Sequence, residues 1–444
     1  MKKRRLLLKV RRVIFVIGGV ALAIYAVWDR VEARRLSRAL DAIHARGEPT
    51  RLGARLPAPR TAEQREAATL YAEAADAALD EDDNGRASRL DVDKPGGVEL
   101  SIDEIRALYR DNAPAMQLLD RATPLDFGGF EAEQRDSDSF APWNVERGLA
   151  TLASIACLRA DLASLGGDGD AAVRALVPCM RLKRTVTYAQ HRAAIADRIL
   201  GSVRILFRHT KPSDAAVGSL QHALESWPDV DLTAGDMMRD RARFIEMSRT
   251  PFYPGLVFTV GRVVLHPFLL RSERRALHSF EGAIEVAQRP WPDRWTALVK
   301  AQHSLLERLR QHPPTLLDRL EDPYGAIVPF SQYLLWQSAH ELAARRLVAA
   351  ALAVERYRRA HGGSPPASIA ASEDPFSGRP LIYKKEAGAY VIYSVDMNGM
   401  DDGGILYGFG AAGLRAVGQQ TPRDYGIRVP TTIAASGGRG SPDR

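Results

Sequence analysis

The spacing of apolar residues along the chain predicts a mainly α-helical protein. Apolar side chains recur mostly three or four positions apart with charged residues between them, which is the period of an amphipathic helix. This pattern covers residues 29–47, 61–79, 101–121, 145–165, 277–286, 291–311 and 331–361. Thr61 and Gln64 have the residue types and the spacing of a capping box at the start of one of these helices. Gly362 and Gly363 can take the left-handed conformation that ends the last one.

An uncharged segment precedes these helices. Residues 13–28 carry no charged side chain, whereas a helix needs about 20 apolar residues, or at least about 17, to cross a bilayer. Trp28 and the long side chains of Arg12 and Arg30 can complete a short span. We therefore expect a transmembrane anchor at residues 13–28. The alternative is a cleaved signal peptide, because residues 21–23 offer a small-x-small cleavage site.

Positive charge is concentrated at the start of the chain. The net charge is +7, and residues 1–12 hold seven basic side chains and no acidic one, so the rest of the chain is neutral in sum. A basic surface for nucleic acid is therefore not expected. Basic residues beside an apolar span stay in the cytoplasm. These features predict a protein of the inner (cytoplasmic) membrane, with a cytoplasmic flank at residues 1–12 and the bulk of the chain periplasmic or extracytoplasmic.

Composition divides the chain after the anchor into four parts. A stalk helix and a linker rich in Pro, Gly and Arg form residues 29–60, and an α-helical extracytoplasmic domain forms residues 61–330. The long helix and a small α+β module follow at residues 331–410. Residues 411–444 are rich in Gly, Ser, Pro and Arg, and we expect this tail to be largely disordered.

One apolar stretch lies inside the helical domain. Residues 251–270 are the most apolar part of the chain after the anchor, but Pro254, Arg262 and Pro267 interrupt them, so a second membrane span is not expected. The stretch either fills the core of the helical domain or forms a surface patch that contacts the membrane or a partner. The residues that would form such a docking patch are Phe252, Tyr253, Leu256, Phe258 and Phe268.

Two cysteines flank a predicted helical hairpin. The segment around Gly166 and Gly167 resembles the turn of one tetratricopeptide-type hairpin, although no regular repeat runs through the domain. Cys157 and Cys179 are each eleven residues from Asp168 in that turn, so an antiparallel pair would place them at equal height. They either form a disulfide, which an oxidising compartment permits and which would stabilise the fold by roughly 3 kcal/mol, or stay small buried thiols in a helix interface.

Short strands follow the long helix. Alternating residues at Leu381 and Tyr383 and at residues 390–395, joined by a turn at residues 386–388, predict an antiparallel β-hairpin. The order of the helix, YRRAHGGSPP, DPFSGRPLIY and YVIYSVDMNGMDD resembles the C-terminal globular domain of the type II secretion major pseudopilins and related type IV pilin-like proteins. The resemblance covers residues 331–404. It implies a helix packed on a small antiparallel sheet, with a Ca²⁺-binding acidic loop after the last tyrosine-rich strand.

The acidic loop contains Asp396, Asn398, Asp401 and Asp402, all within seven residues. Gly399 interrupts them, so the backbone can curl and point several oxygens inward. Ca²⁺ prefers about six to eight oxygen ligands at about 2.3 to 2.6 Å. The resemblance implies that these four residues hold a structural Ca²⁺. The alternative is a solvated turn in which Asp and Asn accept hydrogen bonds from their own backbone.

The anchor segment departs from the pilin pattern. Pilins carry a glycine just before their hydrophobic helix and a glutamate near its start. In this chain Gly18 and Gly19 lie inside the apolar run, and the first glutamate is Glu32. Filament assembly is therefore not expected, and the resemblance is confined to the globular module.

Sequence motifs of catalysis are absent. The chain has no G-x-S-x-G elbow, no Walker phosphate loop and no H-E-x-x-H motif, and its ten histidines are scattered. No catalytic residue is assigned. The sequence predicts a non-enzymatic, membrane-anchored binding or scaffolding protein of the bacterial envelope with an envelope protein as partner. The alternative is a hydrolase that acts on envelope material through a cleft in the helical domain.

Overall fold

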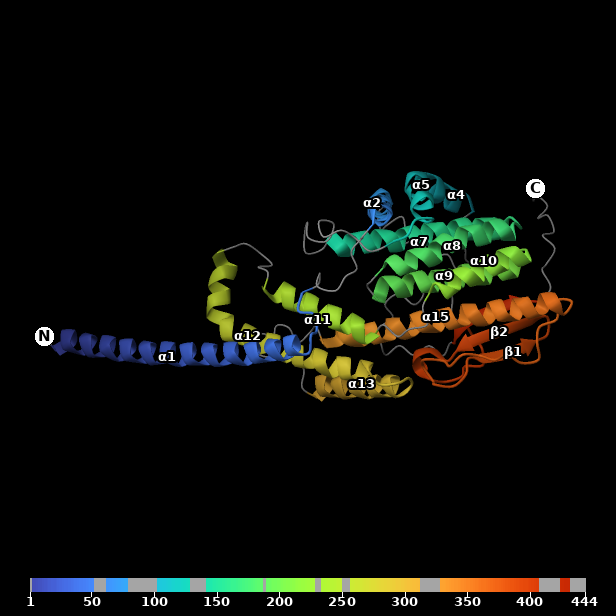
Figure 1. Ribbon diagram of the computed structural model, residues 1–444. Helices are drawn as coiled ribbons and strands as arrows, with labels where there is room; N and C mark the ends of the chain where they lie inside the picture. Colours follow the sequence, from blue (N-terminus) through green and yellow to red (C-terminus); the bar gives the residue numbers. More distant parts are fainter. Residues whose placement is uncertain are drawn as a thin grey trace, which may run out of the picture. The chain divides into compact units, whose positions relative to one another are not determined.

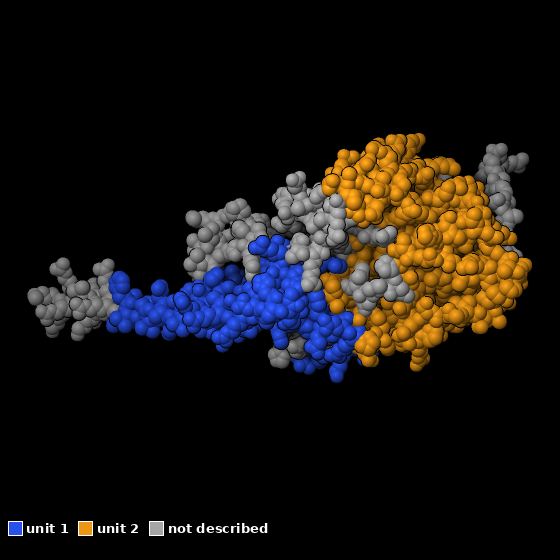
Figure 2. Space-filling model, in the orientation of Figure 1, with its two compact units in different colours: residues 1–55, 237–289, 296–333 blue, residues 56–236, 290–295, 334–444 orange. Residues whose placement is uncertain are grey.

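The computed structural model describes residues 2–51, 61–78, 102–127, 141–186, 189–227, 233–249, 256–311, 328–406 and 424–431. In these ranges the chain forms twelve α-helices and a small antiparallel sheet of three strands (Figure 1). The mainly α-helical prediction is confirmed. The chain divides into two compact units, which we describe separately (Figure 2). Unit 1 contains residues 1–55, 237–289 and 296–333, and unit 2 contains residues 56–236, 290–295 and 334–444.

Unit 1 is built around two long helices, α1 (Lys2–Ala45) and α12 (Leu256–Ala287), which pack against each other. It also holds most of α11 (Thr233–Arg249) and α13 (Asp293–Gln311). The buried side chains of its core are Leu36, Ile43, Phe244, Ile245, Ala276, Leu277 and Phe280. The predicted helix at residues 277–286 is thus the end of a longer helix.

The first half of α1 has a different surface from the second half. The large apolar side chains of the first half are exposed. They are Val13, Ile14, Phe15, Val16, Ile17, Val20, Leu22, Ile24 and Val27. The second half of α1 contributes to the core of unit 1. The helix is continuous from the uncharged segment through the predicted stalk, as residues 29–47 led us to expect.

A buried ion cluster follows the end of α1. The guanidinium of Arg241 on α11 contacts Glu48 at 2.7 Å and Glu281 on α12 at 2.5 Å. Arg46 contacts the same two carboxylates, at 2.7 and 2.8 Å. Because the Arg241 side chain is fully buried, its charge needs these partners, and the cluster ties together the three segments that carry it.

The helices of unit 2 form one packed group. They are α2 (Ala62–Ala77), α4 (Ile102–Asp111), α5 (Ala113–Ala122), α7 (Ala141–Leu165), α8 (Gly169–Thr185), α9 (Ala189–His209), α10 (Asp214–Glu225) and the part of α15 (Val328–Ala360) from Leu334 onward. Helix α7 packs against α2, α8 and α9, and α10 packs against α8. The capping box of Thr61 and Gln64 is present at the start of α2.

The predicted helix at residues 101–121 is two helices. Asn112 separates α4 from α5, and Pro114 lies in the first turn of α5. Proline is tolerated there because the first backbone N–H groups of a helix have no acceptor within it. A proline in the same position also prevents α4 from continuing through it.

Two of the described helices are long and apolar enough to cross a membrane by length and composition, namely Val13–Ala45 and Val145–Leu165. No residue is buried in the most apolar part of the first helix, whereas 56% of the corresponding residues of the second are buried. Helix α7 carries the second stretch, and its apolar residues are explained by its central place in unit 2. Leu149, Leu152 and Leu158 on this helix are completely buried.

The sheet follows α15. Gly362 and Gly363 have φ of 62° and 88°, which confirms the predicted end of the helix. Strands β1 (Ile382–Glu386) and β2 (Ala389–Ser394) form the predicted hairpin, with Glu386 paired to Ala389. The positive φ of Gly388, 78°, allows the tight turn between them. Strand β2 is the central strand, because β3 (Tyr425–Pro430) pairs with its other edge.

We expected residues 411–444 to be largely disordered, but part of this tail forms strand β3. That expectation was wrong for Tyr425–Pro430, which pair with the whole of β2. The physical reason is a local alternation that composition hides: Tyr425, Ile427 and Val429 are buried, and Arg428 between them is exposed. This period of two is typical of a strand with one covered face.

Candidate functional site

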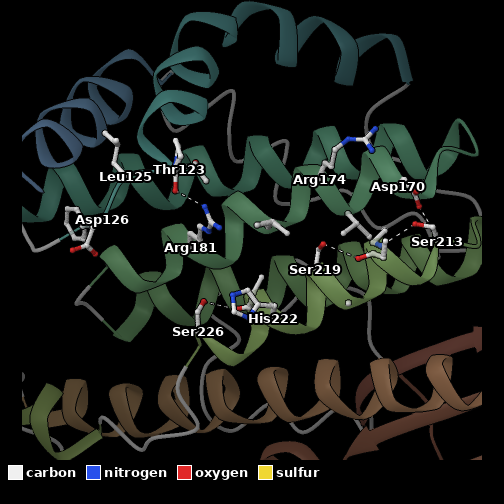
Figure 3. Close-up of a pocket in the computed structure, with 18 of the residues that line it drawn as sticks. Thr123, Leu125, Asp126, Asp170, Arg174, Arg181, Ser213, Ser219, His222 and Ser226 are labelled. Carbon is white, nitrogen blue, oxygen red and sulfur yellow. Dashed lines mark hydrogen bonds between the residues drawn. The ribbon is translucent and has the colours of Figure 1, made fainter. Parts of the chain in front are cut away.

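A groove of about 1100 Å³ lies in unit 2 between α8 and α10, with α2 and the segment after α5 completing its walls (Figure 3). Its lining is mixed, with acidic, basic, hydroxyl and apolar side chains. The lining residues are Glu63, Tyr71, Thr123, Pro124, Leu125, Asp126, Phe127, Asp170, Val173, Arg174, Val177, Arg181, Ser213, Ala215, Ala216, Gly218, Ser219, His222, Ala223 and Ser226. These residues come from four separate parts of the chain.

Helix α8 supplies one wall through a single stripe of residues. Asp170, Arg174, Val177 and Arg181 are three or four positions apart, and Val173 stands next to Arg174, so the five residues lie on one face of the helix. The two valines give this wall an apolar middle. The charged side chains stand at its ends and along its rim (Figure 3).

Helix α10 supplies the opposite wall, and small residues on it leave the groove open. Ala215, Gly218, Ser219 and Ala223 carry little or no side chain toward the space. A Cβ placed on Gly218 would have no other atom within 4 Å. His222 is the largest side chain of this wall, and it is exposed. The width of the groove is therefore set by residue size on α10.

The starts of the two helices are fixed to each other. The backbone N–H of Ser213 donates to Asp170 Oδ1 at 2.6 Å, and the Ser213 hydroxyl caps α10 by accepting from Ala216 at 3.2 Å. The hydrogen bond from the Ser213 backbone is the main reason why the pKa of Asp170 is lowered. A Cβ on Gly169 would lie 2.7 Å from Thr210 Oγ1, so only glycine permits this close approach.

The other end of the groove is held by side chains that reach the segment after α5. Arg181 donates to the Thr123 carbonyl at 2.8 Å, and Gln64 on α2 donates to Asp126 at 2.7 Å. The rings of Tyr71 and Phe127 meet edge to face with their centroids 5.3 Å apart. Both ends of the groove are thus tethered, and the space between its walls is preformed.

Several polar side chains of the groove make hydrogen bonds with groups of α10 or with the residues just after it. The Ser219 hydroxyl donates to Ala215 at 3.0 Å and the Ser226 hydroxyl to Ala223 at 2.6 Å, so each is directed to a carbonyl of its own helix. His222 pairs with Glu225 at 3.4 Å. A serine nucleophile needs a base within hydrogen-bond reach of its hydroxyl. The hydrogen bonds of these two serines provide no such base.

A smaller hollow of about 560 Å³ lies on the other side of α10, against the end of α15. Arg359 contacts Asp214 at 2.8 Å, and Arg356 donates to Gln221 at 2.7 Å. His222 borders both hollows. Its place on the ridge between them makes it accessible from either side.

The acidic loop is placed next to the sheet, and its predicted calcium ligands contact protein groups. Asp396 accepts from His340 at 2.8 Å and Asp401 from the Tyr393 hydroxyl at 2.7 Å. Asn398 donates to Asp402 at 2.6 Å. Among the described residues no group of three or more His, Cys, Asp or Glu is placed to hold a metal ion. Calcium binding by this loop stays a prediction.

The two cysteines lie within hydrogen-bond reach of each other where α7 packs against α8. Cys157 and Cys179 are free, completely buried thiols. Burial, followed by the hydrogen bond with Cys157, raises the pKa of the Cys179 thiol. The Cys179 thiol also lies 3.4 Å from the Ala175 carbonyl of its own helix. Disulfide formation between them stays a prediction.

The predicted docking patch is only partly within the described residues. Phe252 and Tyr253 lie outside them, and Leu256 and Phe258 are in the first turn of α12, where the backbone alone is described. Phe268 packs edge to face on Trp28 of α1, with ring centroids 4.6 Å apart. The structure therefore brings this last member of the patch to the end of the uncharged segment of α1.

His340 and Glu341 follow each other on α15, and their sequence favours a polar pair on a helix surface, but both side chains are buried in unit 2. His340 on α15 lies 2.8 Å from Asp396 and 3.8 Å from Asp197 on α9, and the Tyr425 hydroxyl donates to Asp197. Burial by itself would lower the pKa of His340, but the two carboxylates outweigh it and raise the pKa to about 10. The side chain is therefore a buried cation that joins α9, α15 and the acidic loop.

The next residue of α15 belongs to a second buried ion cluster. Glu341 contacts Lys183 on α8 and Arg192 on α9, and Arg192 also contacts Asp236. Burial lowers the pKa of Lys183 to about 8, with Glu341 opposing the shift. No sequence signal identified either cluster, because each joins residues that are far apart in the chain and have no fixed spacing.

Comparisons of the chain with protein-family models, with curated proteins and with solved structures gave no match.

Proposed function

We propose that the protein is a membrane-anchored binding protein of the bacterial envelope whose helical domain holds an extended segment of a partner protein in the groove between α8 and α10. The observation that carries this proposal is the groove itself, about 1100 Å³ in volume, open, tethered at both ends and lined by polar and apolar groups together. Grooves lined by helices bind peptide segments through apolar side chains that enter the groove, and charged groups at the rim fix the position of the segment.

The charges of the groove indicate the chemistry of the segment. Asp126 and Glu63 border one end, and Arg174 stands toward the other end with an exposed side chain (Figure 3). Val173 and Val177 lie between them. We expect a segment with a basic residue at the Asp126 end, an apolar residue in the middle and an acidic group or carboxylate near Arg174.

The exposed apolar first half of α1 supports the anchor. The large apolar side chains from Val13 to Val27 are exposed, and no other part of the described chain covers them. Contiguous apolar surface of this kind is typical of membrane or protein contact. We propose that it spans the cytoplasmic membrane, with the basic residues before it inside the cell and both units outside.

The second function considered from the sequence was hydrolysis of envelope material. A hydrolase needs an activated nucleophile or a positioned acid–base pair in its cleft. Ser219 and Ser226 in the groove donate to backbone carbonyls instead. We therefore propose binding as the activity of the groove.

Peptide selection tests the proposal. The full chain, purified in detergent, is panned against a phage-displayed library of random peptides, and the affinities of the selected peptides are measured for wild type and two variants. Ser219→Trp fills the groove, and Gln117→Trp places the same ring on the exposed face of α5. We expect the groove variant to lose about tenfold or more in affinity, at least about 1.4 kcal/mol, and the control to bind as wild type does. Equal binding to all three proteins, or no selected peptide, would contradict the proposal.

A further inference from the structure

Helices α1 and α12 run in the same direction within unit 1. Asp29 lies 2.5 Å from His266, and farther along both helices Glu32 lies 3.4 Å from Arg274. The later residue of α1 contacts the later residue of α12, so the two helices are parallel. This register places His266 level with Asp29, the first charged residue after the uncharged segment of α1.

The part of α12 before His266 does not follow α1 farther. Figure 1 shows that the helix bends and that its first part turns away from the axis of α1. Pro267 lies inside the helix at this point. Proline removes a backbone N–H and displaces the carbonyl one turn earlier, which is a common cause of a sharp bend.

The sequence of this first part is mainly apolar, with its few polar positions on one side. Thr259, Arg262 and His266 are three and four positions apart, so they lie on one narrow face of the helix. The other positions of residues 256–265 are apolar apart from Gly261, and they are Leu256, Val257, Phe258, Val260, Val263, Val264 and Leu265. A helix with apolar residues on one side and a basic residue on the other can lie in the surface of a membrane.

Aromatic rings mark the same level. Trp28 ends the uncharged segment and packs on Phe268, just after the bend of α12. Tryptophan is enriched at the boundary between acyl chains and headgroups. Asp29 and His266 beside this pair would face the water of the headgroup layer.

These observations lead us to propose that residues 256–265 of α12 lie in the outer surface of the membrane that α1 crosses. Helix α12 turns off α1 at the level where the proposed span ends, so the backbone of residues 256–265 runs beside the boundary of that span. A second membrane contact at this level limits the tilt of α1 relative to the membrane. The inference rests on the proposed anchor.

Depth-dependent quenching in vesicles tests it. The full chain is reconstituted in vesicles of phosphatidylcholine and phosphatidylglycerol, and an environment-sensitive fluorescent amino acid replaces Val260, Val20 or Glu285 in three separate proteins. A share of the lipids carries a nitroxide either near the headgroup or deep in the acyl chain. We expect the shallow nitroxide to remove roughly half of the emission at Val260, because an interfacial helix lies about 5 to 10 Å below the headgroups. The deep nitroxide should quench Val20, and the exposed position Glu285 should keep its emission.

The three positions separate the inference from the proposal beneath it. Quenching at Val20 without quenching at Val260 would overturn the inference and leave the anchor in place. Equal quenching at Val260 and Glu285 would also overturn it, because unit 1 would then contact lipid without preference for this helix. If neither Val20 nor Val260 were quenched, the proposal that α1 anchors the protein in the membrane would be wrong.

Discussion

At the residue scale, His340 shows how a charge can be stable inside unit 2. Removing a charged side chain from water is costly, and the cost is offset only where partners of opposite charge lie close. His340 has Asp396 on one ring nitrogen and Asp197 near the other. The rings of Trp336, Phe376 and Tyr425 surround it. The cation is thus held between two carboxylates in an otherwise apolar shell, and removing it would take the positive charge away from both carboxylates.

Replacing His340 by Phe should therefore destabilise the protein. We expect a loss of about 3 to 5 kcal/mol in the free energy of unfolding at neutral pH, the usual cost of breaking a buried ion pair from one side. The pKa of about 10 in the folded state lies above the ordinary value of 6.5, so the contribution of His340 is complete below pH 6.5 and is lost as the pH rises to about 10. The difference between wild type and variant, measured by urea unfolding, should narrow across this window. His278→Gln, on the exposed surface of α12, is the control and should change little.

Lys183 should show the opposite dependence on pH. Its pKa is lowered to about 8 from 10.5, mainly by burial, so the charged form is disfavoured in the folded protein. Between about pH 8 and pH 10.5 the unfolded chain holds one more proton than the folded chain at this position, so stability rises with pH there. The advantage of wild type over Lys183→Met in the free energy of unfolding should increase over that interval. A constant difference across the interval would show that Lys183 keeps its ordinary pKa.

At the element scale, sequence periodicity predicted what depends on neighbours along the chain. The capping box of Thr61, the end of α15 at Gly362 and the hairpin turn at Gly388 all follow from local residue types, and all are present. Strand β3 was missed because Gly, Pro and Arg around it dominate the composition, although Tyr425–Pro430 alternates as a strand does. The groove was missed for another reason. Its walls come from α2, α8, α10 and the segment after α5, and no local pattern states which helices become neighbours.

The pairing of β3 with β2 depends on a single glycine. A Cβ on Gly426 would lie 2.3 Å from the Ile392 carbonyl oxygen and 2.5 Å from the Cβ of Tyr393. Backbone at this distance cannot move aside without breaking the strand pair. Gly426→Ala should cost about 1 to 3 kcal/mol or more in the free energy of unfolding, as overpacking of a core does. It should also speed hydrogen exchange at the amides of β2.

Gly282→Ala provides the matched control for this change. Gly282 lies in α12, and nothing stands within 4 Å of its Cβ position. Alanine loses less backbone entropy on folding than glycine in a helix, so the control should gain about 0.5 to 1 kcal/mol. The two variants make the same chemical change and should move thermal stability in opposite directions. A stable Gly426→Ala protein with unchanged exchange in β2 would show that β3 does not pair as described.

At the scale of the whole molecule, charge and apolar surface are separated along the chain in a way that predicts its orientation. The seven basic residues of positions 1–12 equal the net charge of the protein, and the exposed apolar surface of α1 follows directly after them. Basic residues resist transfer across the cytoplasmic membrane, and their effect is strongest close to an apolar span. The orientation of the chain should therefore depend on this flank alone.

Substitution of that flank tests the orientation directly. The reporter is a phosphatase that folds only in an oxidising compartment, and it is fused after Arg444. We expect the wild-type fusion to be active. The fusion should lose most of its activity when the seven basic residues of positions 1–12 are replaced by Gln. An equal number of exposed basic residues changed to Gln within the described helices alters the net charge by the same amount and should leave the activity unchanged. If both variants behaved alike, net charge and not its position would set the orientation. If the wild-type fusion were inactive and a cytosolic reporter at the same place were active, the units would lie inside the cell, and neither an oxidised Cys157–Cys179 pair nor external calcium at the acidic loop could follow.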